Sequence, residues 1–184
     1  MDPSTIQIHE TLQADLEDIL FVEKAAFKTD EEAQLTAELL EDPSARPFIS
    51  LLASKNNKPI GHVLFTKARI EGYQSSENVS LLAPLAVVPD HQGQGIGGML
   101  IKEGLHRLKE NGVEMVFVLG DPDYYRKHGF VPDAGSFGFD PPFDIPQRNA
   151  EAWMVQPLTI QGLSKSVGKF VPANSINKQK YWKE

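Results

Sequence analysis

The chain has 184 residues and a formal net charge of −7, with 41% hydrophobic residues, 23% charged residues and no cysteine. This length fits one domain with a single substantial core. The absence of cysteine excludes disulfide bonds, thiolate metal sites and a cysteine nucleophile. The acidic balance argues against nucleic acid as a partner, because phosphate binding needs a basic surface, and it is compatible with a cationic ligand such as an amine.

The hydropathy of the sequence predicts where in the cell the protein is found. No segment approaches the roughly 18 uninterrupted apolar residues that a membrane span requires. The first ten residues have neither the basic nor the apolar region of a secretory signal. We therefore expect a cytoplasmic protein without membrane contacts. We also expect no metal site, because the acidic residues Asp121 and Asp123 have no partner ligands at suitable spacing.

The first half of the chain predicts both helices and strands. Apolar residues recur with helical spacing from Leu16 to Phe27, and Glu23 falls inside this apolar stripe. Pro84 interrupts an almost continuously apolar run, and since proline cannot donate to a strand ladder, we expect a bulge or a splayed neighbouring strand there. In chain order, the expected elements are a strand at 6–9, helices at 13–27 and 30–41, and strands at 48–54, 60–68 and 78–88.

The second half predicts a strand-and-helix alternation. Gly112 follows an apolar helical pattern, as is typical of a helix end. The order of elements indicates an α/β fold with at least one parallel crossover between the strands near residues 80 and 115. We expect residues 1–160 to form the domain, and 161–184 to be a polar tail that packs on it or extends it. The expected elements are a helix at 95–111, a strand at 115–119, a short helix at 121–129, an ordered loop at 131–149 and a strand at 152–158.

Four glycines lie between Gln92 and Gly98, at the start of the predicted helix. Glycine lets the backbone approach a ligand closely and present several N–H groups, and a helix N-terminus adds partial positive charge. The segment therefore predicts a pyrophosphate-binding loop that needs no lysine. The alternative interpretation is a turn that only joins the strand to the helix.

The spacing of these glycines leaves several phosphate ligands to consider. Gly93, Gly95 and Gly98 satisfy the dinucleotide-binding fingerprint, but four residues separate the first glycine from the strand, and the unit lies in mid-chain. A Walker loop is excluded because no Gly-Lys-Ser/Thr follows.

The spacing Gln92-x-x-Gly95-x-Gly97, after an apolar strand and into a helix, resembles the coenzyme A signature of the GNAT superfamily of N-acetyltransferases. The signature region covers about residues 59–132. Segments similar to the superfamily are Leu85-Ala86-Val87 and the aromatic Tyr124 to Phe130, and those similar to its YhbS-like branch are 82–87, 118–122 and Gly61-His62.

This resemblance implies a mixed, mostly antiparallel twisted sheet of about six to seven strands flanked by helices, with a parallel β-α-β crossover and splayed central strands. It implies acetyl-CoA as acyl donor and direct transfer to a primary amine of a small-molecule or peptide acceptor. A homodimer is expected by analogy only. The residues implied to bind the donor are Leu85, Ala86, Val87, Gln92, Gly93, Gln94, Gly95, Ile96, Gly97 and Gly98.

Such a reaction has two proton requirements. A lysine-like amine is neutral in about one molecule in 2,500 at pH 7, a cost of about 4.6 kcal/mol, whereas protonating the departing thiolate is worth about 2 kcal/mol at most. The resemblance implies Tyr125 as the general acid beside the sulfur, with Tyr124 as the alternative ring.

The general base has three candidates. Glu23 is one, because a carboxylate in an apolar stripe should have a raised pKa, although a backbone group or an arginine could simply satisfy it. His62, in an apolar strand, is another, and a core histidine is the alternative. A water chain could replace both. His91 could contact phosphate or solvent.

Two other functions stay open. A coenzyme A-binding sensor or interaction module would keep the glycine loop without needing Tyr125. A dinucleotide-binding oxidoreductase would use the same glycines for another cofactor.

Overall fold

The computed structural model describes residues 5–72, 78–159 and 167–183. The first part of the predicted tail, 161–166, and its last residue, 184, lie outside the described residues. The helices and strands, in chain order, are β1 (Gln7–Glu10), α1 (Leu16–Phe27), α2 (Glu31–Glu41), β2 (Ile49–Lys55), β3 (Lys58–Ile70), β4 (Val79–Val87), α3 (Ile96–Glu110), β5 (Met115–Leu119), α4 (Pro122–Tyr125), β6 (Val131–Pro132), β7 (Phe139–Asp140), β8 (Trp153–Pro157) and β9 (Gly168–Val171).

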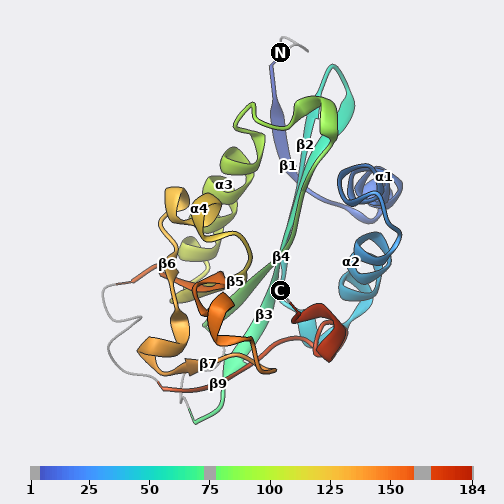
Figure 1. Ribbon diagram of the computed structural model, residues 1–184. Coiled ribbons are helices and arrows are strands. Elements are labelled where there is room, and N and C mark those ends of the chain that lie inside the picture. Colours follow the sequence, from blue (N-terminus) through green and yellow to red (C-terminus); the bar gives the residue numbers. More distant parts are fainter. Residues whose placement is uncertain (1–4, 73–77, 160–166, 184) are drawn as a thin grey trace.

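The strands form a mixed sheet in the order β1-β2-β3-β4-β5-β8-β6, in which only the β4–β5 pair is parallel. Helix α3 makes the crossover between these two strands. Figure 1 shows α1 and α2 on one side of the sheet and α3 and α4 on the other. This main path confirms the expected mixed α/β sheet of six to seven strands, and the described residues add β9, which pairs with β3 and β7.

The sheet is irregular at Pro84, as the sequence predicts. Val63 pairs with Leu85, but Phe65 pairs with Leu82, so β4 has one extra residue in this interval. Pairing between β4 and β5 covers only Val79–Leu81 and 115–117. The predicted bulge and the splayed central strands are therefore both present, and they leave the carboxyl ends of β4 and β5 apart.

The last described segment packs on the domain through aromatic side chains. Trp182 is 2% exposed and Phe170 is fully buried, and both pack with Trp153 in an aromatic cluster. A few spaced aromatic side chains thus bury parts of a segment whose composition is otherwise polar, with several lysines and asparagines. The expected loop at 131–149 contains the two-residue strands β6 and β7.

Asp42, which follows α2, fastens this segment to the domain. Its carboxylate accepts hydrogen bonds of 2.6–2.8 Å from the backbone N–H and hydroxyl groups of Ser44 and Ser175. Burial disfavours the charged carboxylate, but these four hydrogen bonds outweigh that effect and lower the pKa of Asp42 to about 2. Lys178 adds an ion pair with Glu38 of α2 at 3.1 Å.

We expect Asp42→Asn to lower the free energy of unfolding by about 1–2 kcal/mol at pH 7, because ionised Asp42 is stabilised only in the folded state. A lowered pKa gives a contribution that is present above the unfolded pKa and is lost as the pH falls towards about 2. Urea unfolding at pH 7 and at low pH checks this. Equal destabilisation at both pH values would contradict it, and Asp140→Asn, an exposed strand substitution, is the control.

Candidate functional site

The loop between β4 and α3 has an open glycine backbone. Gly93 and Gly95 have φ angles of +73° and +83°, and a Cβ atom at either position would meet no atom within 4 Å. Both residues therefore need to be glycine for backbone conformation, and both face free space. The side chains of Gln92 and Gln94 brace the loop by donating to backbone carbonyls at 2.9 and 3.0 Å.

Helix α3 begins directly at this open loop. Its N-cap is Gly95, no side chain caps its first N–H groups, and its first turn has no acidic residue. These uncapped N–H groups and the helix dipole make a site that favours an anion. The geometry fits a diphosphate, since the ligand can reach the backbone where side chains are absent.

The other two glycines of the loop have a packing role. A Cβ atom on Gly97 would lie 2.3 Å from the Tyr124 hydroxyl, and one on Gly98 would lie 2.8 Å from Cε1 of His128. Their small size lets the segment that contains α4 pack on the first turn of α3. Gly93 and Gly95 thus provide an open backbone, whereas Gly97 and Gly98 allow close packing.

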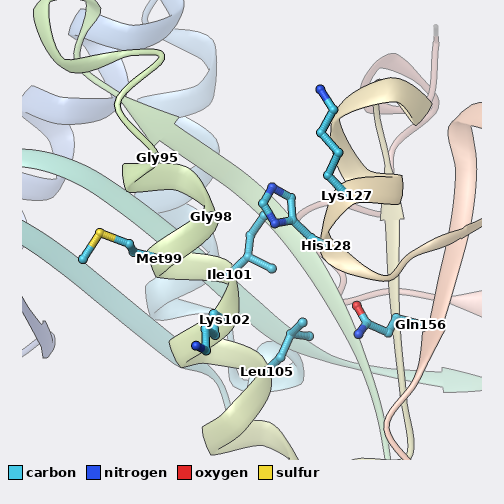
Figure 2. Close-up of a pocket in the computed structure, with 9 residues that line it drawn as sticks. All are labelled: Gly95, Gly98, Met99, Ile101, Lys102, Leu105, Lys127, His128 and Gln156. Carbon is cyan, nitrogen blue, oxygen red and sulfur yellow. The ribbon is translucent and has the colours of Figure 1, made fainter.

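A groove of about 530 Å³ continues from the loop along α3. Figure 2 shows it between α3 on one side and Lys127, His128 and Gln156 on the other. Gln156 Oε1 is buried and has no hydrogen-bond partner among the described residues, as is also true of His91 Nδ1 just before the loop. The lining residues are Gly95, Gly98, Met99, Ile101, Lys102, Leu105, Lys127, His128 and Gln156.

A second cleft, of about 350 Å³, lies where β4 and β5 have separated, and we call it the Tyr125 cleft. The bulge of β4 forms one part of it, and the residues around the α1–α2 turn and those after β9 form others. Its lining residues are Phe27, Glu31, Glu32, Leu35, Leu82, Ala83, Pro84, Leu85, Leu119, Tyr125, Ile176, Lys180, Tyr181 and Lys183.

Tyr125 is held in this cleft by packing. Its ring lies against Gly120, where a Cβ atom would be 2.6 Å from Cε2, and makes edge contacts with Tyr124 and Phe130. Tyr124 instead directs its hydroxyl to Gly97, and burial raises the pKa of the Tyr124 phenol. Of the two candidate rings, Tyr125 is the one that lines the cleft.

Glu23 and His62, predicted as separate candidates, contact each other. His62 Nδ1 lies 2.5 Å from Glu23 Oε1, and both side chains are 0% exposed. The partner of Glu23 is therefore a histidine and not a backbone group or an arginine. Burial raises the pKa of Glu23, His62 opposes the shift, and the charge of Glu32, which lines the Tyr125 cleft, adds to it.

The pair continues into a chain of hydroxyl groups. His62 Nε2 lies 3.0 Å from Ser50 Oγ, which accepts a hydrogen bond of 2.7 Å from Thr11. Thr11 lines a third cleft, of about 480 Å³, at the surface beside α1 and α2. A continuous hydrogen-bonded path thus connects buried Glu23 with the surface, while Glu23 Oε2 has no partner among the described residues.

Comparison with known proteins decides the family. Residues 9–130 match the model of the acetyltransferase (GNAT) family. YjhQ, an uncharacterised N-acetyltransferase of Escherichia coli K12, is 47% identical over 156 residues, which cover 85% of this chain and 86% of YjhQ. The chain belongs to the GNAT acetyltransferase family.

Solved structures agree with this assignment. The crystal structure of the GNAT family N-acetyltransferase YhbS from Escherichia coli, in complex with CoA, superposes with a TM-score of 0.84 at 28% identity, covering 94% of this chain and 92% of that one. A GNAT family acetyltransferase from Brucella melitensis in complex with acetyl-CoA has a TM-score of 0.75 at 24% identity, covers 94% and 99% of the two chains, and shows the shared fold.

Within this GNAT domain, sequence reasoning missed Thr11, Ser50 and Gln156. The signal for Ser50 lay in strand register, because antiparallel pairing of Leu52 with His62 puts the side chains of Ser50 and His62 on the same face of the sheet. Among the described residues, no cluster of three or more His, Asp or Glu side chains could hold a metal ion. No helix in the described parts of the chain combines the length and apolarity needed to cross a membrane.

Proposed function

We propose that this GNAT protein transfers an acetyl group from acetyl-CoA directly to a primary amine. The observation that carries the proposal is the open loop at Gly93 and Gly95, which adjoins both the uncapped N-terminus of α3 and the splayed strands that form the Tyr125 cleft. The CoA bound to YhbS supports the choice of donor, and the fold favours CoA over a dinucleotide.

Backbone groups of the loop and of β4, together with side chains of the groove, would form the donor site. Backbone N–H groups of 92–98 would hold the diphosphate, as at other helix N-termini that bind phosphate. The edge of β4 at Leu85, Ala86 and Val87 would pair with the pantetheine arm, since the pairing of β4 with β5 ends before these residues. Lys102 and Lys127, which line the groove, supply positive charge for phosphate groups.

The two proton transfers fall to different residues. Tyr125 would protonate the departing thiolate, because its ring lies in the cleft at the point where the strands open. The Glu23–His62 pair would receive the proton of the amine. Glu23 lies one helical turn before Phe27 of the Tyr125 cleft, and its raised pKa makes it a stronger base than an ordinary carboxylate.

A panel of amines, with free thiol release as the readout, tests the proposal. We expect turnover with at least one primary amine, and we expect Tyr125→Phe to lower kcat about 30-fold, the equivalent of about 2 kcal/mol, without weakening coenzyme A binding. The matched control is Tyr124→Phe, which removes the neighbouring hydroxyl outside the cleft. Clear coenzyme A binding without thiol release for any amine would favour a sensor module and contradict the proposal.

A further inference from the structure

Two lysines of the protein itself lie in the Tyr125 cleft. Lys180 and Lys183 line the cleft from the segment that follows β9, together with Ile176 and Tyr181. Figure 1 shows this segment, coloured red, beside α2. The Tyr125 cleft therefore contains two primary amines of the protein itself.

The segment is held firmly in this position. Asp42 and Ser44 bind its beginning through Ser175 and the backbone N–H of Asn174, the latter at 2.8 Å from Ser44 Oγ. At its end, Trp182 is buried, and its indole N–H donates to the Ile176 carbonyl at 2.9 Å. Lys183 directly follows this anchored tryptophan and lines the cleft.

The two lysines differ in their electrostatic surroundings. Lys180 Nζ lies 4.5 Å from the ring centre of Tyr181 and 3.8 Å from Glu31. The hydrogen bond with Tyr181 and, to a smaller extent, the charge of Glu31 raise the pKa of Lys180. Within the described residues, Lys183 forms no ion pair. Lys180 is therefore held by its neighbours, whereas Lys183 has no ion pair within the described residues that holds its amine.

We infer that the protein acetylates its own Lys183, a proposal that rests on the proposed acetyltransferase function. The deprotonated Nζ of Lys183 attacks the thioester carbonyl carbon of acetyl-CoA. A C–N bond forms and the C–S bond breaks. The coenzyme leaves as the thiol after taking a proton from Tyr125, and the proton of the amine passes to the Glu23–His62 pair. The product is an uncharged acetyl-lysine on the wall of the cleft, which removes one positive charge opposite Glu31 and Glu32.

Incubating the full chain with acetyl-CoA alone tests this inference. Peptide mass spectrometry, with a protease that does not cleave at lysine, follows the acetylation of each lysine over time. Lys58, exposed at the start of β3, reports the spontaneous chemical rate. We expect Lys183 to react at least about tenfold faster than Lys58, because the cleft holds amine and thioester together. We expect Lys180 to react more slowly than Lys183.

Three further results decide the interpretation. A rate constant that does not depend on protein concentration supports transfer within one molecule, and a rate that rises with concentration would overturn it. Tyr125→Phe should slow the labelling of Lys183 but not of Lys58. If free amines release thiol while Lys183 reacts only at the rate of Lys58, the self-acetylation inference fails and the proposed function stands. If neither reaction occurs, the proposed function fails as well.

Discussion

Gly95→Ala should weaken the binding of coenzyme A about 10- to 100-fold, which corresponds to losing one hydrogen bond between a backbone N–H and a charged phosphate. The substitution acts in two ways. It strains a residue whose φ angle is +83°, and it puts a methyl group into the open space that we assign to the diphosphate. Calorimetric titration with coenzyme A measures the effect.

Gly112→Ala provides a closely matched control at the other end of α3. Gly112 has a φ angle of +79° and, like Gly95, would present its Cβ atom to open space. The free energy of unfolding of both variants should therefore fall by a similar amount, about 1–2 kcal/mol, because alanine adopts the left-handed conformation at this cost. Only Gly95→Ala should lose affinity. Equal affinity of the two variants for coenzyme A would show that the diphosphate binds elsewhere.

The backbone of the glycine loop could be predicted because the signal is local. Glycines that need positive φ angles and a helix that begins directly after them lie within a few residues, so spacing alone predicts an open backbone at a helix N-terminus. The bulge at Pro84 was predictable for the same reason, since proline lacks the N–H donor wherever it stands. The packing role of Gly97 and Gly98 was not predictable, because the side chains that contact them, Tyr124 and His128, come from a later helix and turn.

The interior of the site depended on contacts between distant parts of the chain. Glu23 and His62 are separated by 39 positions, and periodicity could show only that each lies on an apolar face. Their contact follows from how α1 packs over β3, which a single sequence does not give. The Tyr125 cleft is similar, because its wall is completed by Ile176 and Tyr181 from a segment that sequence composition describes as polar.

The charges that line the Tyr125 cleft affect how an amine bound there would lose its proton. Glu31 and Glu32 stand at the start of α2, and Lys180 and Lys183 stand on the opposing segment, so the lining carries both signs of charge. A carboxylate near an ammonium ion attracts it but also favours its protonated form. Under the proposed function, a separate base would have to take the proton, and buried Glu23, whose pKa is raised, would meet this need better than Glu31 or Glu32, which line the cleft.

Replacing the pair by apolar residues, Glu23→Met with His62→Leu, should lower kcat/KM for an amine about 100-fold or more at pH 7, the usual contribution of a general base. The loss should shrink as the pH approaches the pKa of the amine, because more of the substrate is then already neutral. The pH dependence of kcat/KM for both proteins measures this. A double variant with the wild-type pH profile would show that the pair is structural and that water carries the proton.

Stability separates the functional role of the pair from a structural one. Apolar replacement of a buried ionic pair is often neutral or stabilising by about 1–4 kcal/mol, whereas His62→Leu alone leaves the Glu23 carboxylate without its partner and should cost about 3–5 kcal/mol. Because burial raises the pKa of Glu23, its contribution to stability is fully present below its unfolded pKa and is lost as the pH rises through its folded pKa. The double variant should therefore gain stability relative to the wild type as the pH rises above about 4.3, the ordinary pKa of glutamate. Greater stability combined with lower activity in one protein is the result expected if the Glu23–His62 pair is kept for its chemistry and not for the fold.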